Sequence, residues 1–126
     1  MLYRQKMEKK YKVYYFFDKK GIEPVREYIN SQSLKERVKI FSFIDFLENS
    51  GGYLEEPYSK HVKDKIRELR IDFSKNRHRI MYFTFTGEKI VLLSAFTKKT
   101  EKTPQKEINK AINNYNNFLL NKEKYD

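Results

Sequence analysis

Charged side chains recur at alternate positions in an otherwise strand-like segment of the chain. Glu68, Arg70 and Asp72 alternate with apolar residues across the segment 66–73. Alternate side chains of an extended strand point to the same face of a sheet, so these three charges are expected to share one face. A carboxylate can accept a proton, and a guanidinium group can hold a phosphate through two hydrogen bonds. Such a face could carry acid–base chemistry on a phosphate.

Further cations lie near this segment in the sequence. They come before it, after the next turn and at the end of a third strand-like segment: Lys60, Lys63, Lys65, Arg77, Arg79, Lys98 and Lys99. All of them could converge on one exposed sheet surface or on its rim. The alternative is purely structural, because the solvent face of an antiparallel sheet is charged and Glu68 opposite a cation can be a simple cross-strand pair.

The face on which Arg79 lies depends on how the segments 66–73 and 78–85 pair. If Phe73 pairs with His78, Arg79 joins the face of Glu68. A shift of one residue would place His78 and Tyr82 there instead, because the side chains of a strand alternate between its two faces. The sequence leaves both pairings open.

The pattern of apolar residues predicts a single α+β domain over residues 1–126, with the element order β-α-α-β-β-β-α. The last three strands form an antiparallel meander that the first strand joins, with the helices on one side of the sheet. The apolar run 89–97 predicts a central strand buried on both faces. Strands are predicted at 11–18, 66–73, 78–85 and 89–97, helices at 22–30, 33–50 and from Pro104 onward, a loop at 53–65, a turn at 74–77, and a frayed or helical extension at 1–10.

Capping residues and apolar stripes support the two longer helices. Ser33 is a suitable N-cap with Glu36 three positions later, and Thr103 precedes Pro104 as the predicted cap of the last helix. The buried stripe of the helix 33–50 is predicted to contain Leu34, Val38, Phe41, Ile44 and Leu47, with Ile40 and Phe43 beside it. That of the last helix is predicted to contain Ile108, Ala111, Ile112, Tyr115, Phe118 and Leu119.

The composition restricts the possible partners and chemistry. The formal net charge is +10, and such an excess of positive charge attracts polyanions, of which nucleic acid is the commonest. The absence of cysteine excludes disulfides, thiolate metal sites and cysteine catalysis, and two distant histidines argue against a zinc site. No apolar run approaches the ~20 residues of a membrane span, and the first residues lack the apolar core of a signal peptide. A cytoplasmic location without membrane contact is therefore expected.

One long run carries a family resemblance. It is HVKDKIRELRIDFSKNRHRIMYFTFTGEKIVLLSAFTKKTEKTPQKEINKA, over residues 61–111. The run resembles the pattern of the RelE/ParE superfamily of bacterial toxins, especially its HigB-like branch. The matching features are Lys63 before the IRELR strand, the RHRIMYF strand, and VLLSAFTKKTEKTP at the end of the third strand and the start of the last helix. By element order the resemblance covers nearly the whole chain.

The resemblance implies a RelE-like fold and a type II toxin that cuts messenger RNA on the ribosome and arrests growth. The implied chemistry needs no cofactor or metal: the ribose 2′-hydroxyl attacks the adjacent phosphate and leaves a 2′,3′-cyclic phosphate. The implied partners are the ribosome with its message and a helix-turn-helix antitoxin of the HigA type, in a heterotetramer of two toxins and two antitoxins.

The resemblance also implies roles for individual residues. Glu68 becomes the candidate general base, Arg79 the ligand of the transition-state phosphate, and Arg70 its assistant. Lys98 and Lys99 match the basic pair after the third strand, where they would hold phosphate or ribosomal RNA. Lys60, Lys63, Lys65 and Arg77 are expected to bind RNA in a salt-dependent way.

The general acid is left open by the sequence. Some relatives carry a His or Tyr near the C-terminal end for this role, but this chain has no His after His78, and Tyr115 lies in the predicted buried stripe. Tyr82, His78 and Lys99 are the candidates. Two other functions are compatible with the same fold: a ParE-like inhibitor of DNA gyrase, and a basic RNA-binding module without catalysis.

Overall fold

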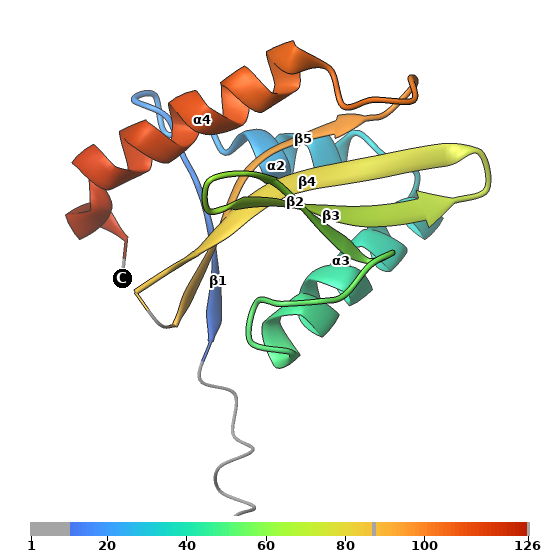
Figure 1. The fold of residues 1–126 in the computed structure, drawn as a ribbon, viewed down its shortest axis with the longest axis horizontal. Helices are drawn as coiled ribbons and strands as arrows, with labels where there is room; N and C mark the ends of the chain where they lie inside the picture. Colours follow the sequence, from blue (N-terminus) through green and yellow to red (C-terminus); the bar gives the residue numbers. More distant parts are fainter. Residues whose placement is uncertain (1–10, 87, 126) are drawn as a thin grey trace, which may run out of the picture.

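The computed structural model describes residues 11–86 and 88–125 (Figure 1). The prediction for residues 1–10 lies outside this part. The described elements are β1 (Lys12–Tyr15), α2 (Pro24–Asn30), α3 (Leu34–Asn49), β2 (Ser59–Lys63), β3 (Ile66–Phe73), β4 (Asn76–Phe85), β5 (Lys89–Thr97), α4 (Gln105–Leu120) and the short 3₁₀ helix η1 (Lys122–Lys124).

The strands form one mixed sheet in the order β1-β5-β4-β3-β2. β1 pairs parallel to β5, and the other neighbours are antiparallel. The predicted α+β fold is confirmed, and the first strand does join the meander across the helical pair. β5 is an interior strand and is buried on both faces, as its apolar run predicts, although β4 occupies the centre of the sheet.

The prediction that residues 53–65 form only a loop is wrong, because β2 lies within it and pairs with β3. The sequence of β2, SKHVK, is polar and lacks the apolar alternation of a half-buried strand. Lysines of this kind are common on edge strands, where they discourage pairing with other chains. β2 therefore depends on its hydrogen bonds to β3 and could not be identified from its own residues.

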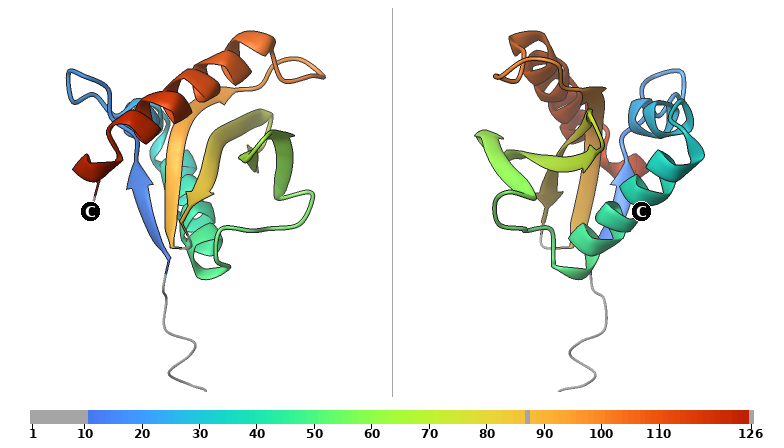
Figure 2. Two further views of the ribbon diagram at one scale, coloured as in Figure 1. Left: turned by 60° about the vertical axis from the view of Figure 1, so that its left-hand side comes forward. Right: turned by 90° about the vertical axis from the view of Figure 1, so that its right-hand side faces the viewer.

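Helices cover both faces of the sheet, so the prediction of helices on one side is wrong. The α2–α3 pair lies on one face and α4 on the other (Figure 2). Two separate hydrophobic clusters result, one under α2 and α3 and one under α4. The physical reason is the run Ile90–Leu93 in β5, which is fully buried and needs apolar cover on both faces.

α3 begins as predicted and buries a narrower stripe than predicted. The hydroxyl of its N-cap Ser33 accepts a hydrogen bond from the Glu36 N–H, as in a capping box. Its side chains Ile40, Ile44 and Leu47 are buried against the sheet. The other predicted stripe residues, Leu34, Val38 and Phe41, are exposed, and Phe43 is partly buried.

α4 packs on the sheet through its predicted stripe. Ala111 and Phe118 are fully buried, and Ile108, Ile112, Tyr115 and Leu119 pack around them. The N-cap is Pro104, however, and not Thr103. Thr103 therefore precedes the helix, and its hydroxyl donates a hydrogen bond to Glu68.

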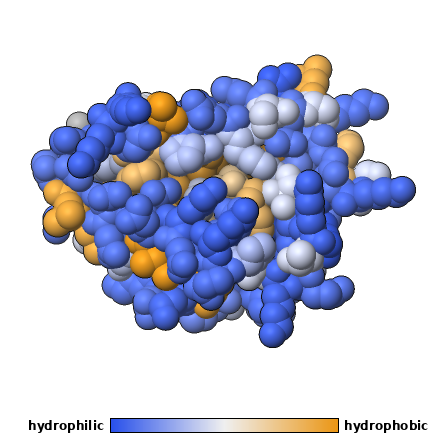
Figure 3. Space-filling model, turned by 90° about the horizontal axis from the view of Figure 1, so that it is seen from above, coloured by the Kyte–Doolittle hydropathy of each residue, from blue (hydrophilic) through white to orange (hydrophobic). Residues whose placement is uncertain are grey.

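Hydrophilic side chains dominate the surface on the α4 side of the molecule, with smaller hydrophobic areas between them (Figure 3). Among the helices of residues 11–86 and 88–125, none combines the length and apolar character that crossing a membrane requires.

Candidate active site

The pairing of β3 with β4 decides which charges share a face. Phe73 pairs with Asn76 across a two-residue turn, and Arg70 pairs directly with Arg79. This register differs by two residues from the pairing of Phe73 with His78. An even shift preserves the face of every side chain, so Arg79 lies on the same face as Glu68.

A β-bulge brings Lys98 to this face. Met81 pairs with Ser94 and Tyr82 with Leu92, so that Leu93 is the extra residue in β5. An extra residue reverses the alternation of side chains beyond it. Without the bulge, Ser94 would lie on the α3 side of the sheet with Leu92. With the bulge, Ser94 and the even-numbered residues after it face the α4 side. Lys98 thereby joins the face that carries Glu68.

Glu68 is the centre of a buried cluster of charges. Its side chain is 2% exposed, and Oε2 accepts a hydrogen bond of 2.8 Å from the Thr103 hydroxyl. The other carboxylate oxygen, Oε1, lies 3.7 Å from Nε of Arg70 and 3.9 Å from Nε of Arg79. The two guanidinium groups compensate the negative charge of a carboxylate that is removed from water.

Both arginines keep one buried donor without a hydrogen bond, although each is ion-paired with Glu68. In the described part of the chain, the Nε–H groups of Arg70 and Arg79 are buried and have no hydrogen-bond partner. Arg79 is fixed through its other end, since Nη1 donates to Asp72 Oδ1 at 2.8 Å and to the His78 carbonyl at 2.9 Å. Buried donors without a partner are rare in folded proteins, and two side by side suit a ligand with two acceptors, such as a phosphate.

Lys98 is a buried cation beside the same cluster. Its side chain is largely shielded from water, and its backbone N–H donates to the Arg77 carbonyl. Burial lowers the pKa of Lys98 below its ordinary value of 10.5, and Arg79, Arg70 and Arg77 lower it further, whereas Glu68 opposes them. A lysine with a lowered pKa gives up its proton more readily than a solvated one.

Glu68, Lys98 and Thr103 line a cleft, which we name the Glu68 cleft, and Arg70 and Arg79 lie beside it. Its volume is about 250 Å³, and it is lined by Lys60, His61, Val62, Glu68, Lys98, Glu101, Lys102, Thr103 and Ile108. Lys60 lies directly opposite Glu68 in the pairing of β2 with β3. The cleft therefore combines two carboxylates, the buried Glu68 and the exposed Glu101, with the three lysines Lys60, Lys98 and Lys102.

Four polar residues of the cleft were not identified from the sequence: His61, Glu101, Lys102 and Thr103. Thr103 was interpreted as a helix cap because it precedes a proline. His61 and Lys102 lie in charged segments that resemble solvated surface, and only the pairing of β2 with β3 and the path of the 98–104 loop bring them near Glu68. His61 Nε2 contacts the Asp64 carbonyl at 2.7 Å.

Two candidates for the general acid lie on the opposite face of the sheet. Tyr82 is buried in the α3 cluster, where its hydroxyl pairs with Ser59 at 2.8 Å. His78 is buried between the helices and β4. Its Nε2 atom is hydrogen-bonded to Oε2 of Glu36 at 2.8 Å, and its Nδ1 atom to the Tyr28 hydroxyl at 2.6 Å. The structure does not bring either side chain to Glu68, because even positions of β4 face the helical pair.

The other predicted site residues, Arg77, Lys99, Lys63 and Lys65, do not line the Glu68 cleft. Arg77 is half-buried and shares the Glu68 face through its pairing with Asp72. Lys99 is exposed and does not line the cleft, unlike its neighbour Lys98. Lys63 and Lys65 are also exposed and lie beyond a bulge in β2.

No group of three or more potential metal-binding side chains of the types His, Cys, Asp and Glu occurs among the described residues. The cleft is lined by three lysines and two carboxylates, and Arg70 and Arg79 lie beside Glu68, so cations are in excess and the site is suited to binding an anion.

The family of the chain follows from a comparison with known proteins. The family model described as Phage derived protein Gp49-like (DUF891) matches residues 27–116, which include α3, β2 to β5 and all charged residues of the cleft. No curated protein matches the sequence. The matched segment covers well over half of the chain. The protein therefore belongs to the phage-derived Gp49-like family, a family of RelE- and HigB-like toxins of toxin–antitoxin systems.

Proposed function

We propose that the protein is the toxin of a type II toxin–antitoxin system and acts as an endoribonuclease on translated messenger RNA. One observation supports this most strongly: the buried Glu68 carboxylate is ion-paired with two arginines whose buried Nε–H groups make no hydrogen bond in the described structure. Cleavage of RNA through its own 2′-hydroxyl needs a proton acceptor, donors for the phosphoryl oxygens and a proton donor for the leaving oxygen.

Glu68 takes the proton of the ribose 2′-hydroxyl in this mechanism. The hydrogen bond from Thr103 holds one carboxylate oxygen, so the other is directed toward Arg70 and Arg79. As the proton leaves, O2′ forms a bond to the adjacent phosphorus. A base held in one orientation by a second group loses less entropy in reaching the reactive geometry.

Arg79 and Arg70 stabilise the charge that develops on the phosphoryl oxygens. Their Nε–H groups make no hydrogen bond in the described structure and are ion-paired with Oε1 of Glu68, so the base and the phosphate donors share one small region. Arg79 is held in place by Asp72 and by the His78 carbonyl before substrate arrives. Donors that are already oriented stabilise a transition state without reorganisation.

Lys98 serves as the general acid. It gives its proton to O5′ as the bond between phosphorus and O5′ breaks, which leaves a 2′,3′-cyclic phosphate and a free 5′-hydroxyl. The lowered pKa of Lys98 favours this transfer, because an efficient catalytic acid has a pKa nearer to the working pH. Proton exchange with water then restores Lys98 and Glu68. The remaining cations attract the RNA backbone through their charge and transfer no proton. They are Lys60, Lys63, Lys65, Arg77 and Lys99.

The proposed setting is the ribosome, with a helix-turn-helix antitoxin as the neutralising partner in a heterotetramer. The family supports a toxin within a toxin–antitoxin system. The strongly positive net charge supports a polyanionic target.

The proposal is tested by inducing the protein in bacterial cells and mapping new 5′ ends on translated messages. We expect growth arrest with cleavage inside coding regions, and loss of both with Glu68→Gln or Arg79→Ala. Glu88→Gln, in the exposed turn between β4 and β5, is the matched control and should remain toxic. DNA damage without message cleavage would instead indicate a gyrase inhibitor. Growth arrest and cleavage that persist in Glu68→Gln and Arg79→Ala would refute the proposed site.

A further inference from the structure

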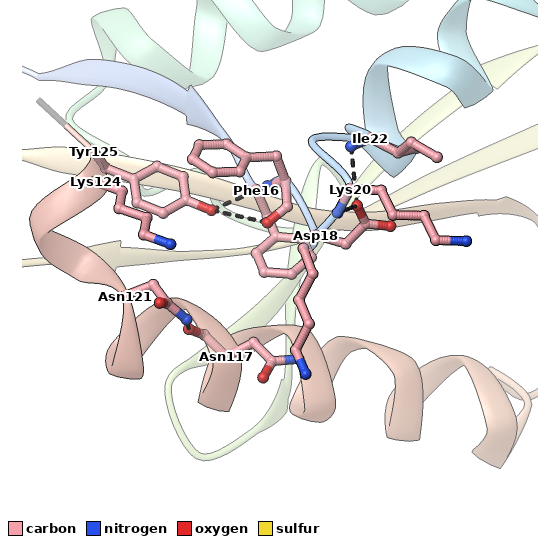
Figure 4. A pocket seen from close by; sticks show the side chains of 10 residues that line it. Phe16, Asp18, Lys20, Ile22, Asn117, Asn121, Lys124 and Tyr125 are labelled. Carbon is pink, nitrogen blue, oxygen red and sulfur yellow. Dashed lines mark hydrogen bonds between the residues drawn. The ribbon is translucent and has the colours of Figure 1, made fainter.

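A second cavity lies at the other end of α4, away from the Glu68 cleft. Its volume is about 590 Å³, and it lies between the segment after β1 and the last turn of α4 with η1 (Figure 4). We name it the Phe17 pocket. α4 has 16 residues, and a helix of that length extends about 24 Å. The two cavities share no lining residue, so the Phe17 pocket has no part in the cleavage mechanism proposed above.

Aromatic rings form the inner wall of the Phe17 pocket. The half-buried ring of Phe17 stacks on Tyr125, with ring centroids 4.5 Å apart and an angle of 23° between the planes. The Tyr125 hydroxyl accepts a hydrogen bond of 3.0 Å from the Phe17 N–H and donates to the Phe17 carbonyl at 3.3 Å (Figure 4). Phe16, which is buried, lies behind them. Because Phe16 and Tyr125 are buried, the half-buried ring of Phe17 is the surface in this wall on which a nucleobase can stack.

Two amides from α4 form the opposite side. Asn117 and Asn121 are four residues apart and therefore lie on one face of the helix end, toward the pocket (Figure 4). Asn121 donates to the Asn117 carbonyl, which fixes its orientation. The Asn117 amide has no hydrogen-bond partner among the described residues. An amide offers both a donor and an acceptor, as the edge of a nucleobase requires.

The rim of the pocket is positive. Lys19, Lys20 and Lys124 are exposed at its mouth, against Asp18 as the single acid. The Asp18 carboxylate already accepts hydrogen bonds from the backbone N–H groups of Lys20 and Ile22, at 2.8 and 3.0 Å. These bonds hold the 18–22 loop in one conformation, so the two lysines are carried on a fixed turn. Ammonium groups at the mouth of an aromatic pocket suit a phosphate attached to a base.

We propose that the Phe17 pocket binds a nucleotide, with the base between the aromatic wall and the Asn117–Asn121 amides and the phosphate at the lysine rim. The volume is suitable, since pockets for small ligands measure about 300–1,000 Å³. The nucleotide can be free or part of a single-stranded RNA, because both present the same base and phosphate.

Binding is tested by titration of the isotope-labelled protein with three probes. These are adenosine monophosphate, inorganic phosphate and a single-stranded hexanucleotide whose riboses are all 2′-O-methylated, so that cleavage cannot occur. We expect shifts of backbone amide resonances in 16–22 and 117–125 with a nucleotide probe. Saturation by the mononucleotide indicates a free nucleotide as ligand, and a response to the hexanucleotide alone indicates a nucleotide within RNA. Inorganic phosphate should bind at least tenfold more weakly than the nucleotide probe.

Variants separate base recognition from general attraction by positive charge. Asn117→Ala, at an exposed position, should weaken binding about threefold to tenfold, as the loss of one hydrogen bond does. Phe17→Leu keeps an apolar side chain in the wall, removes the stacking platform and should weaken binding roughly tenfold. Lys20→Glu should weaken binding more than Lys35→Glu, a matched exposed lysine on α3.

Three outcomes would overturn the proposal: no response in either pocket segment with any nucleotide, equal affinity for phosphate and for the nucleotides, or equal losses with Lys20→Glu and Lys35→Glu. The non-cleavable probe keeps these outcomes independent of nuclease activity. A protein that fails to cut RNA can still bind a nucleotide in the Phe17 pocket, and a protein that cuts RNA can fail to bind a nucleotide there.

Discussion

The central residues of the molecule are charged groups placed where folded proteins rarely keep charge. Glu68 and Arg79 are each about 2% exposed, and Lys98 is nearly as deeply buried. Removing charges from water is costly unless each is compensated, and a well-packed apolar cluster would stabilise the fold at least as well. The cluster therefore contributes little to folding that apolar residues could not, which agrees with the role in binding an anion that we propose for its charges.

Thr103 tests whether the orientation of Glu68 matters for catalysis. Thr103→Val removes the hydroxyl that donates to Glu68 and keeps the shape of the side chain. Hydrogen bonds to charged groups contribute about 1.5–3 kcal/mol, so the cleavage rate should fall about tenfold to hundredfold. Thr103→Ser, which keeps the hydroxyl, is the control and should stay within a few-fold of the natural protein. Equal activity of the valine variant, measured by initial rates, would exclude a positioning role.

Lys98 tests the assignment of the general acid through the pH dependence of the reaction. The acid must be protonated to act, so the cleavage rate should fall as the pH rises through the pKa of Lys98, which lies below 10.5. Lys98→Arg keeps the positive charge and cannot release a proton in the working range, so the rate should fall about 10²–10⁴-fold and the alkaline limb should disappear. An unchanged pH profile in the arginine variant would assign the acid elsewhere, with His61 as the next candidate in the cleft.

At the scale of elements, the helical pair is joined to the sheet by a buried polar network. Glu36 on α3 accepts hydrogen bonds from Ser33 and Asn76 and contacts Nε2 of His78 on β4. His78 in turn contacts Tyr28 on α2. These bonds connect α2, α3 and β4 on the face opposite the cleft, where they fix the strand whose next residue is Arg79.

The network predicts how stability depends on pH. The hydrogen bonds from Ser33, Asn76 and His78 lower the pKa of Glu36 from 4.5 to about 2. A carboxyl whose pKa is lower in the folded state stabilises that state above its unfolded pKa, and this contribution is lost as the pH falls through the folded value. Glu36→Gln should therefore lower the Tm at pH 6, and the difference should shrink between about pH 4.5 and pH 2. A difference that stays constant over this range, measured by thermal unfolding, would contradict the role of Glu36.

The sequence predicted those elements whose own residues carry a strong pattern. The regular alternation in β3 correctly predicts that Glu68, Arg70 and Asp72 share a face, and the apolar run of β5 correctly predicts burial on both sides. Three features escaped prediction because neighbours decide them. β2 forms only through pairing with β3, the bulge at Leu93 turns Lys98 to the Glu68 face, and Thr103 donates to Glu68 rather than capping α4.

At the scale of the whole molecule, the dominant property is its net charge of +10. Binding of single-stranded nucleic acid to such a protein releases counterions, and the logarithm of affinity falls with the logarithm of salt by about 0.7 per phosphate contact. Lys60→Ala removes one cation of the cleft wall, so the magnitude of this slope should decrease by about 0.7 for a non-cleavable RNA. Lys35→Ala, on the outer side of α3, should leave the slope unchanged. Equal slopes for both variants in fluorescence anisotropy titrations would place the RNA elsewhere.

The most direct test of the central claim is to follow one message in a reconstituted translation reaction with the purified protein. We expect cleavage products with 2′,3′-cyclic phosphate ends, no cleavage when the nucleotide before the scissile bond carries a 2′-deoxyribose, and full activity in the presence of a chelator that leaves the ribosome's magnesium in place. Glu68→Gln should reduce the rate about 10²–10⁴-fold, as loss of a general base does. Products with 3′-hydroxyl ends, cleavage at the deoxyribose, or an undiminished rate in Glu68→Gln would contradict the proposed chemistry of the Glu68 cleft.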